Sequence, residues 1–299
     1  IKMRSLVTGG AGFIGSNLVD LLLEKGHEVI VIDNESSDAH ENFYWNDQTT
    51  QSKADITDFG AIRPLFDGVD YVFHLAAESR IQPAILNPTY ATEVNVVGTC
   101  NVLQACREAG VKRVVYSSTS AAYGLTNTPP LSEDMPRDCL NAYSITKCAG
   151  EDLVSMYYKL YGLETVNLRY FNVYGPRQPL KGQYAPVIGL FLRQKNAGEP
   201  MTIVGDGEQR RDFTYVGDVA MANYLAATSE SSECLGQLFN IGTGTNYSVL
   251  ELAQMIGGGY VHIDDRPAEA RISLANNNKA KNVLGWNPTA VLSDWLKNA

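Results

Sequence analysis

The amino-acid sequence predicts a doubly wound α/β protein with a parallel central sheet, and three observations support this. Short runs of β-branched and aliphatic residues alternate with amphipathic segments of helical length over the first two-thirds of the 299 residues. The runs are apolar along almost their whole length, which is typical of strands buried on both faces. A glycine-rich turn also separates the first run from the first helical segment. Together these features predict a parallel sheet with helices on both sides.

The elements follow one another in a regular order along the chain. Strands are expected at RSLVTG (4–9), EVIVID (28–33), VDYVFHLAA (69–77), VKRVVYSS (111–118) and TVNLRYFNV (165–173), with a further one just before ADITD (54–58). Helices are expected at 17–26, 92–109, 142–161, 216–228 and 248–256. Each alternation of strand and helix adds one more parallel strand to the sheet.

The alternation of strand-like and helix-like segments stops after residue 173, where loops rich in Gly, Pro and Gln begin. We therefore expect two parts. Residues 1–173 and 214–243 form the sheet domain, and residues 174–213 and 244–299 form a smaller lobe for the substrate. Such a lobe would lie at the carboxyl ends of the strands, where folds of this kind bind ligands.

Composition excludes several classes of function. The formal net charge of -9 and the pI near 5.0 disfavour non-specific binding to nucleic acid or to an anionic membrane surface. Five cysteines without a CxxC pair predict neither a disulfide framework nor a metal site. No apolar run approaches the roughly 18 residues of a membrane span, and no leader pattern opens the chain. A cytoplasmic protein is the expectation.

The turn VTGGAGFIGSNL is a candidate dinucleotide site. Gly9, Gly12 and Gly15 lie between the first strand and the first helix, with Phe13 and Ile14 among them. Glycines allow a tight turn and close backbone approach, and the helix N-terminus offers free N–H groups to a pyrophosphate. The spacing alone is weak evidence, but here it has the expected strand and helix on either side.

Asp33 ends the second strand, 18 residues after Gly15. A carboxylate there can hold the adenosine ribose diol and would repel a 2′-phosphate, so NAD is favoured over NADP. The alternative role for Asp33 is a turn or cap residue. We expect Asn34 beside it, and Asp55 and Ile56 after the third strand, to border the adenosine.

The stretch NAYSITK places Tyr143 and Lys147 four residues apart. In a helix these positions share one face, so the ammonium can act on the phenol. By itself, a Tyr and a Lys at this spacing are more often exposed surface residues than catalytic residues.

Five motifs together give the sequence a family resemblance. They are the glycine turn, HLAA (74–77), SSTSAAYG (117–124), YSITK (143–147) and RYFNVYGPRQ (169–178). With these motifs the chain resembles the extended short-chain dehydrogenase/reductase family over almost its whole length, and most of all the UDP-glucose/UDP-galactose 4-epimerases within it. The resemblance implies a Rossmann-like fold, NAD as cofactor and a nucleotide-sugar substrate. It also implies a homodimer paired through helices 92–109 and 142–161, although the faces of these helices could equally be internal.

The resemblance gives the tyrosine and lysine their roles. Tyr143 becomes the candidate general base, and Thr119 the hydroxyl that shares or relays the sugar proton; strand-end hydrogen bonding is the other role for Thr119. A phenol has a reference pKa of about 10, so lowering it by about 3 units costs roughly 4 kcal/mol. Lys147 and the positive nicotinamide ring are the expected sources of that stabilisation.

The residues after Thr119 separate the reactions of this family. The 4,6-dehydratases carry Thr-Asp-Glu at this element and the UDP-glucuronate decarboxylases Thr-Ser-Glu. Here Ser120 and Ala121 follow Thr119. Elimination of water needs an additional acid and base, so their absence favours oxidation and re-reduction at one carbon. That is 4-epimerisation, with NAD retained between turnovers.

The resemblance also implies the remaining contacts. Further cofactor-binding residues are Leu75, Ala76, Ala77, Asn95, Ser117 and Tyr170; substrate-binding residues are Ser79, Asn172, Arg211, Arg266, Glu269 and Ser273. The two arginines and Asn172 would contact the diphosphate, and Glu269 the nucleotide ribose. The small Ser273 stands where a tyrosine would exclude a 2-acetamido sugar.

Some alternatives stay open from the sequence. Arg211 or Arg266 could instead pair with Asp212 or Asp265, and Tyr170 and Phe171 could be core aromatics. The segment AAESRIQPA (76–84) carries Glu78, Arg80 and Gln82, which match no known substrate class, so a uronate read by Arg80 is a further hypothesis. Two alternative functions remain: another nucleotide-sugar-modifying enzyme and a non-catalytic dinucleotide sensor. A sensor would usually have lost the Tyr or the Lys of YxxxK.

Overall fold

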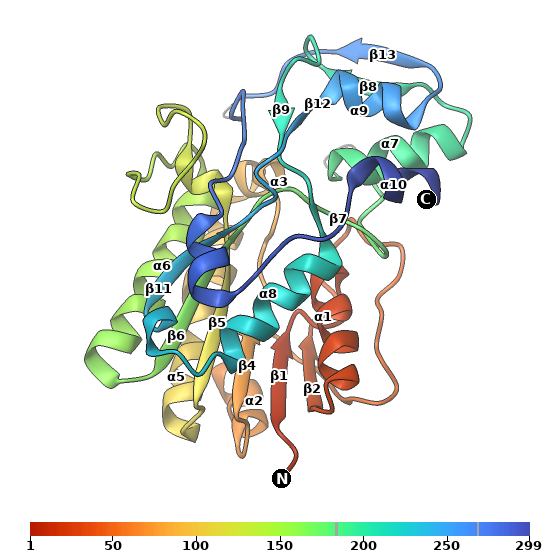
Figure 1. Ribbon diagram of the computed structural model, residues 1–299. Coiled ribbons are helices and arrows are strands. Elements are labelled where there is room, and N and C mark those ends of the chain that lie inside the picture. Colours follow the sequence, from red (N-terminus) through yellow and green to blue (C-terminus); the bar gives the residue numbers. More distant parts are fainter. Residues whose placement is uncertain (183–184, 268) are drawn as a thin grey trace.

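The fold is built on a sheet of seven parallel strands in the order β11-β6-β5-β4-β1-β2-β3 (Figure 1). The computed structural model describes residues 1–182, 185–267 and 269–299. The strands are β1 (Arg4–Thr8), β2 (Glu28–Asp33), β3 (Thr50–Lys53), β4 (Tyr71–His74), β5 (Arg113–Thr119), β6 (Glu164–Tyr170) and β11 (Gln237–Ile241). Leu6 of β1 lies between Ile30 of β2 and Val72 of β4. The predicted doubly wound sheet is confirmed.

The order of the strands creates a crevice at their carboxyl ends. The chain adds β2 and β3 on one side of β1 and then returns to place β4 on the other side. The connections after β1 and β4 therefore leave the sheet in opposite directions, and ligands bind in the gap between such connections. The lobe stands over this end of the sheet (Figure 1).

Helices cover both faces of the sheet. α1 (Phe13–Glu24) packs on α8 (Val216–Thr228) on one face, and α5 (Thr99–Ala109) on α6 (Ala142–Tyr161) on the other. The predicted bounds of α6 and α8 are confirmed, and the ends of α6 carry clear local signals. Asn141 caps α6 by accepting from the N–H of Ser144 at 2.9 Å, and Gly162 ends it in the left-handed conformation.

The helix expected at 92–109 is three pieces. α4 (Pro88–Thr92) begins at Asn87, whose side chain accepts from Tyr90 N–H. A π-helical segment, Glu93–Gly98, follows, and then α5. The widened turn holds the buried Asn95, and π-turns of this kind often mark functional sites. Shorter pieces are α2 (Phe59–Ile62), α3 (Ile81–Leu86) and the 3₁₀ turns Arg63–Phe66, Ser120–Tyr123 and Ser232–Cys234.

The lobe is more regular than its loop-like sequence suggests. Its elements are α7 (Val187–Asn196), β8 (Met201–Val204), β9 (Arg210–Arg211), β12 (Tyr247–Ser248), α9 (Val249–Ile256), β13 (Tyr260–Ile263) and α10 (Leu292–Lys297). Short strands β7 (Val173–Tyr174) and β10 (Thr214–Tyr215) pair where the lobe joins the sheet. The expectation of loops at 174–213 is wrong for α7, which buries Phe191 against Met201 and Leu252 in a separate small core.

The division into two parts stays a prediction, with one amendment that the packing suggests. Residues of the π-helical segment Ala280–Leu284 lie in the core of the sheet domain, and so does Trp286. The indole of Trp286 donates to the carbonyl of Asp218 at 2.8 Å. This segment therefore packs with the sheet, although it follows the lobe in the chain. In the described ranges we find no helix with the length and apolar character of a membrane span.

Candidate active site

A cavity of about 540 Å³ lies between the carboxyl ends of the strands and the lobe. This volume is in the range typical of small-molecule sites. Nearly all of the predicted site residues line it. They are Gly9, Gly12, Phe13, Ile14, Asp33, Asn34, Asp55, Ile56, Leu75, Ala76, Ala77, Ser79, Ser117, Thr119, Tyr143, Lys147, Tyr170, Asn172, Arg211, Arg266, Glu269 and Ser273. Segments that are far apart in the sequence thus share one cavity.

The glycine turn has the shape that a dinucleotide requires. Gly9 has a positive φ of 70°, and a Cβ there would lie 2.9 Å from the backbone N of Ala76. A Cβ on Gly15 would overlap the carbonyl oxygen of Gly9. Gly12 differs: it begins α1 with no side-chain cap, and a Cβ would meet no protein atom closer than 3.5 Å. The uncapped end of α1 is therefore open to the cavity and fits a pyrophosphate.

The carboxylate of Asp33 is held by backbone groups at the edge of the cavity. It accepts from Ala11 N–H at 3.1 Å and from Glu35 N–H at 2.8 Å. Burial raises the pKa of Asp33 despite these two hydrogen bonds. Asn34 donates to Asp55 at 3.2 Å, which ties the ends of β2 and β3 together. This arrangement suits a ribose diol beside Asp33.

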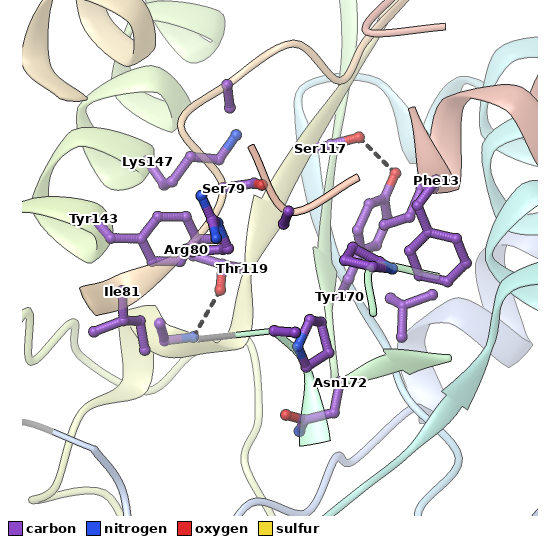
Figure 2. Close-up of a pocket in the computed structure, with 18 of the residues that line it drawn as sticks. Phe13, Ser79, Arg80, Ile81, Ser117, Thr119, Tyr143, Lys147, Tyr170 and Asn172 are labelled. Atoms are coloured by element: carbon purple, nitrogen blue, oxygen red, sulfur yellow. Dashed lines mark hydrogen bonds between the residues drawn. The ribbon is translucent and has the colours of Figure 1, made fainter. Parts of the chain in front are cut away.

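Tyr143 and Thr119 meet in the middle of the cavity. Tyr143 is the second residue of α6, and Thr119 ends β5. The Thr119 hydroxyl is close enough to act on the phenol of Tyr143, and Thr119 Oγ1 accepts from Ala121 N–H at 3.1 Å. Figure 2 shows Tyr143 and Lys147 extending from one helix toward the strand that carries Thr119. A phenol and a hydroxyl are thus placed to share one proton.

Burial and neighbouring groups both act on the pKa of Tyr143. Burial raises the pKa of Tyr143, Glu78 acts in the same direction, and the nearby hydroxyl of Thr119 lowers it. Burial also lowers the pKa of Lys147 to about 8, opposed by the nearby Glu151. In the protein without NAD, burial outweighs these neighbours and the pKa of Tyr143 stays raised, so its lowering by Lys147 and the nicotinamide ring remains a prediction for the complex with NAD.

Hydrogen bonds behind the cavity fix the strand ends. Tyr170 shares a hydrogen bond of 2.6 Å with Ser117 and accepts from Asn223 at 2.8 Å (Figure 2). Its ring lines the cavity, whereas Phe171 is fully buried in a small core cluster with Tyr123. Of the two aromatics, only Tyr170 is placed to contact a ligand in this cavity.

The lobe side of the cavity is lined with cationic and polar groups. The guanidinium of Arg211 is buried, which lowers its pKa, and it donates to the carbonyls of Arg210 and Arg271. Asp212 turns elsewhere: its carboxylate accepts from Thr243 and Gly244. The suggested ion pair of Arg211 with Asp212 is therefore wrong; Arg211 lines the cavity, and Glu269 is its acidic neighbour there.

Two further groups at this side have features that suit a ligand. Asn172 has a positive φ of 28°, which Asn adopts more readily than most residues. Its carbonyl accepts from Thr214 N–H, which holds this backbone in place. The hydroxyl of Ser273 is buried and has no hydrogen-bond partner within the described residues. Buried polar groups are normally paired, so this hydroxyl is available to a ligand.

Asn95 is the predicted site residue that does not line the cavity. Its amide accepts from Glu78 N–H at 2.9 Å and donates to the Glu78 carbonyl at 3.1 Å and to Thr146 at 3.0 Å. All of these bonds are internal to the protein. The prediction of Asn95 as a cofactor contact is corrected to a supporting role, since it joins the loop after β4 to α6.

The sequence interpretation missed several groups of lining residues, of which two are informative. One is the loop after Asp33, which contributes Ser36, Ser37, His40 and Phe43. Its position directly after the carboxyl end of a parallel strand was an available signal. The other is the start of α7, which contributes Pro186, Val187, Ile188 and Leu190. That helix was not predicted, so its side chains had no assigned place.

A sequence model of the NAD dependent epimerase/dehydratase family matches residues 5–242. The chain belongs to this family. It is 38% identical to the putative UDP-glucose 4-epimerase of Methanocaldococcus jannaschii, with 98% of each chain covered. It is 37% identical to the UDP-glucose 4-epimerase of Thermotoga maritima solved with UDP-glucose, with a TM-score of 0.93 over 99% of this chain and 96% of that one.

The cofactor prediction is also confirmed. The epimerase/dehydratase family is NAD-dependent, and homologous structures contain NAD. One of these is the UDP-glucose 4-epimerase of Thermus thermophilus, which is 34% identical with a TM-score of 0.89 over 99% of this chain and 97% of that one. Relatives in this epimerase/dehydratase family also include a UDP-glucuronate 4-epimerase, a UDP-N-acetylglucosamine 4-epimerase and a decarboxylase. The protein is thus a member of a nucleotide-sugar epimerase family whose substrates vary.

Proposed function

We propose that this protein is an NAD-dependent 4-epimerase of UDP-hexoses, acting on UDP-glucose and UDP-galactose and on their 2-acetamido counterparts. The observation that carries the proposal is that Tyr143 and Thr119 line one cavity, with Ser120 and Ala121 after Thr119 where an eliminating enzyme would have a carboxylate. Ser120 and Ala121 line the cavity directly. Two hydroxyl groups suffice to remove and return a proton at one carbon.

Each polar group near the sugar then has a role. Tyr143 accepts the proton of the 4-hydroxyl, and Thr119 hydrogen-bonds the same oxygen as it becomes a carbonyl. Lys147, with its pKa near 8, is mostly charged at pH 7 and favours the phenolate one helical turn away. Bound NAD supplies the hydride acceptor at C4 and, after the ketose has turned its other face, the hydride donor.

Binding is expected to be concentrated on the nucleotide, so that the sugar can turn. Arg211 supports this, since its charge is buried at the cavity and its internal bonds go to carbonyl oxygens. Together with Asn172 and Arg266 it would hold the diphosphate through charge-assisted hydrogen bonds. Glu269, which lines the same side, would take the nucleotide ribose hydroxyls.

Ser273 supports acceptance of 2-acetamido sugars. Its side chain is small, lines the cavity and has a buried hydroxyl. A tyrosine there would occupy the space that an acetamido group needs. A relative named UDP-N-acetylglucosamine 4-epimerase from Methanobrevibacter ruminantium, 33% identical, is consistent with such a substrate within the family.

A UDP-uronate 4-epimerase is the second candidate, because Arg80 lines the cavity and such enzymes occur among the relatives. Its guanidinium already has two acidic neighbours, Asp38 and Glu78. Because these two carboxylates already neutralise its charge, Arg80 is less able to bind a sugar carboxylate. A dehydratase or decarboxylase is disfavoured by Ala121, and a non-catalytic sensor by the presence of both Tyr143 and Lys147.

We also propose a homodimer. The helices expected to pair carry exposed apolar side chains: Val97 is 48% exposed, Ile145 55% and Leu160 69%. The π-helical segment Glu93–Gly98 and α5 both contact α6, so these side chains lie on neighbouring helices. Sedimentation equilibrium of Leu160→Asp against Leu125→Asp, a control on an exposed loop, would test it. A dimer that persists in Leu160→Asp, or a monomeric wild type, contradicts this surface as the interface.

The function is tested by incubating the purified protein, without added NAD, with a panel of nucleotide sugars and following the products by NMR. Interconversion of C4 stereoisomers of neutral UDP-hexoses is the expected result. Conversion of UDP-glucuronate alone would move the assignment to the second candidate. A stable keto-deoxy product would indicate a dehydratase, and no conversion of any sugar by NAD-loaded protein would leave a sensor.

A further inference from the structure

The loop after β4 holds charged residues that the proposed chemistry does not use. Glu78 is fixed by Asn95, which accepts from its N–H at 2.9 Å and donates to its carbonyl at 3.1 Å. The same Asn95 amide donates to Thr146 of α6 at 3.0 Å. Glu78 is thus tied to the helix that carries Tyr143, so the distance between the two is set by rigid elements and not by a flexible loop.

The carboxylate of Glu78 is largely withdrawn from water, since its side chain is 17% exposed. Burial raises the pKa of Glu78, and Arg80 lowers it. The Nε of Arg80 lies 3.9 Å from Glu78 Oε1. A weakly solvated carboxylate acts over a longer range than an exposed one, because water screens it less.

Arg80 lies between two carboxylates. Besides its contact with Glu78, its Nη2 donates to Asp38 Oδ1 at 2.5 Å. Asp38 has a side chain that is 82% exposed, so its own influence is screened by solvent. Arg80 also acts on His40 and lowers its pKa in addition to burial. The arginine is therefore shared between the loop after β2 and the loop after β4.

Polar and titratable side chains from three segments lie around Tyr143. Thr119 and Tyr116 face it from β5, Lys147 and Cys148 from its own helix, and Glu78 from the loop after β4. Glu78 and Cys148 both raise the pKa of Tyr143. Burial raises the pKa of the Cys148 thiol too, so it stays neutral. Of the two, Glu78 is the group whose negative charge opposes ionisation of the phenol near neutral pH.

We propose that Arg80 is a positioning residue for proton transfer at Tyr143, because it pairs with Glu78 and offsets a carboxylate that would otherwise favour the neutral phenol. Asp38 weakens this effect by drawing Arg80 away from Glu78. The three charges thus set how readily Tyr143 accepts the sugar proton. The proposal rests on the proposed function, in which Tyr143 is the base.

The test combines two readouts on the purified protein with its NAD. The first is the pH titration of the phenolate absorbance, taken as the difference between each protein and its Tyr143→Phe counterpart. The second is the acidic limb of kcat/KM for UDP-glucose. We expect Arg80→Gln to move both midpoints up by about 0.5 to 1 pH unit, and Glu78→Gln to move them down by a similar amount.

Two more variants separate charge from structure. Asp38→Asn should lower the midpoints slightly, since Arg80 is then free to pair with Glu78. The double variant Glu78→Gln/Arg80→Gln should titrate close to Glu78→Gln, because the other carboxylate beside Arg80, that of Asp38, is 82% exposed and screened by solvent. Arg63→Gln, which removes an ion pair with Asp67 far from the cavity, is the control and should move neither midpoint.

The outcomes distinguish this proposal from the function on which it rests. The proposal that Arg80 acts through Glu78 is overturned if the midpoints are equal in wild type, Arg80→Gln and Glu78→Gln. It is also overturned if the upward shift caused by Arg80→Gln is equally large when Glu78→Gln is present. If no nucleotide sugar is converted, the proposed function fails, while the absorbance titration still measures whether Glu78 and Arg80 control the phenol.

Discussion

The carboxylate of Asp33 accepts a hydrogen bond of 3.1 Å from the backbone N–H of Ala11, so the end of β2 is joined to the glycine turn after β1. A second bond, from Glu35 N–H at 2.8 Å, fixes the other carboxylate oxygen. The charge that should select NAD is thus positioned by the backbone and not by a flexible partner. This arrangement leads to the first prediction.

Asp33→Asn should weaken NAD binding about tenfold and reduce the preference for NAD over NADP. The amide keeps an acceptor for Ala11 N–H but loses the charge that binds a ribose diol and repels a 2′-phosphate. Calorimetric titration of the cofactor-stripped protein with each dinucleotide measures both effects, with the exposed Asp47→Asn as control. An unchanged ratio of the two affinities would remove Asp33 from cofactor selection.

Gly15→Ala and Gly12→Ala should fail in different ways. A Cβ at 15 overlaps the Gly9 carbonyl, so Gly15→Ala should lower the free energy of unfolding by about 2 kcal/mol or more. At 12 the space is open, so Gly12→Ala should unfold almost like wild type and bind NAD at least tenfold more weakly. Denaturant unfolding of the cofactor-free proteins and NAD titration give the two numbers. Equal unfolding energies for the two variants would contradict this distinction.

Tyr143→Phe should reduce kcat by about 10² to 10⁴, because it removes the proton acceptor but keeps the ring. Thr119→Ala should cost less, about tenfold to a hundredfold, since the phenol remains. Tyr158→Phe, on the same helix, is the matched control. Turnover is measured by NMR of the C4 stereoisomers at saturating substrate. Near-normal turnover of Tyr143→Phe would exclude it as the base.

Ser273→Tyr should change sugar selection without changing the chemistry. The larger side chain fills the space expected to take a 2-acetamido group, so kcat/KM should fall at least tenfold for the UDP-N-acetylhexosamines and little for UDP-glucose and UDP-galactose. Ser273→Ala is the control for loss of the hydroxyl alone. If the ratio of the two specificity constants is the same in Ser273→Tyr as in wild type, this position does not gate sugar size.

His74 should make the protein sensitive to acid. It is buried between Thr8 and Thr99, with hydrogen bonds of 2.7 and 2.9 Å, and burial lowers its pKa to about 3. The unfolded chain binds this proton below pH 6.5 and the folded chain does not, so its contribution to stability is lost as pH falls from 6.5 toward 3. The loss should approach about 1.4 kcal/mol per pH unit.

The slope of the unfolding free energy between pH 6 and 4.5 tests this assignment. His74→Gln should be less stable at pH 7 and should show a smaller slope, whereas the exposed His262→Gln should keep the slope of wild type. Some slope will remain, because burial also lowers the pKa of His27. An identical slope in wild type and His74→Gln would mean that other groups cause the acid sensitivity.

Local signals explain why much of the fold could be predicted. α6 begins at the cap Asn141 and ends at Gly162, and each signal depends only on neighbours in the chain. β11 was not predicted, because its five residues acquire strand geometry by pairing with β6. The π-helical turn at Asn95 likewise follows from contacts with Glu78 and Thr146, which lie far from it in the sequence.

The sequence by itself determined the parallel sheet, the glycine turn and the family, because periodicity, turn chemistry and motif spacing are all properties of the linear chain. Only the tertiary structure decided the state of the groups in the cavity. Burial raises the pKa of Tyr143. The carboxylate of Asp212 accepts a hydrogen bond from Thr243 and does not pair with Arg211. Both results depend on segments that are distant in the sequence, because these segments exclude water from a side chain and place particular atoms beside it. The spacing of residues along the chain determines neither the burial nor the neighbours.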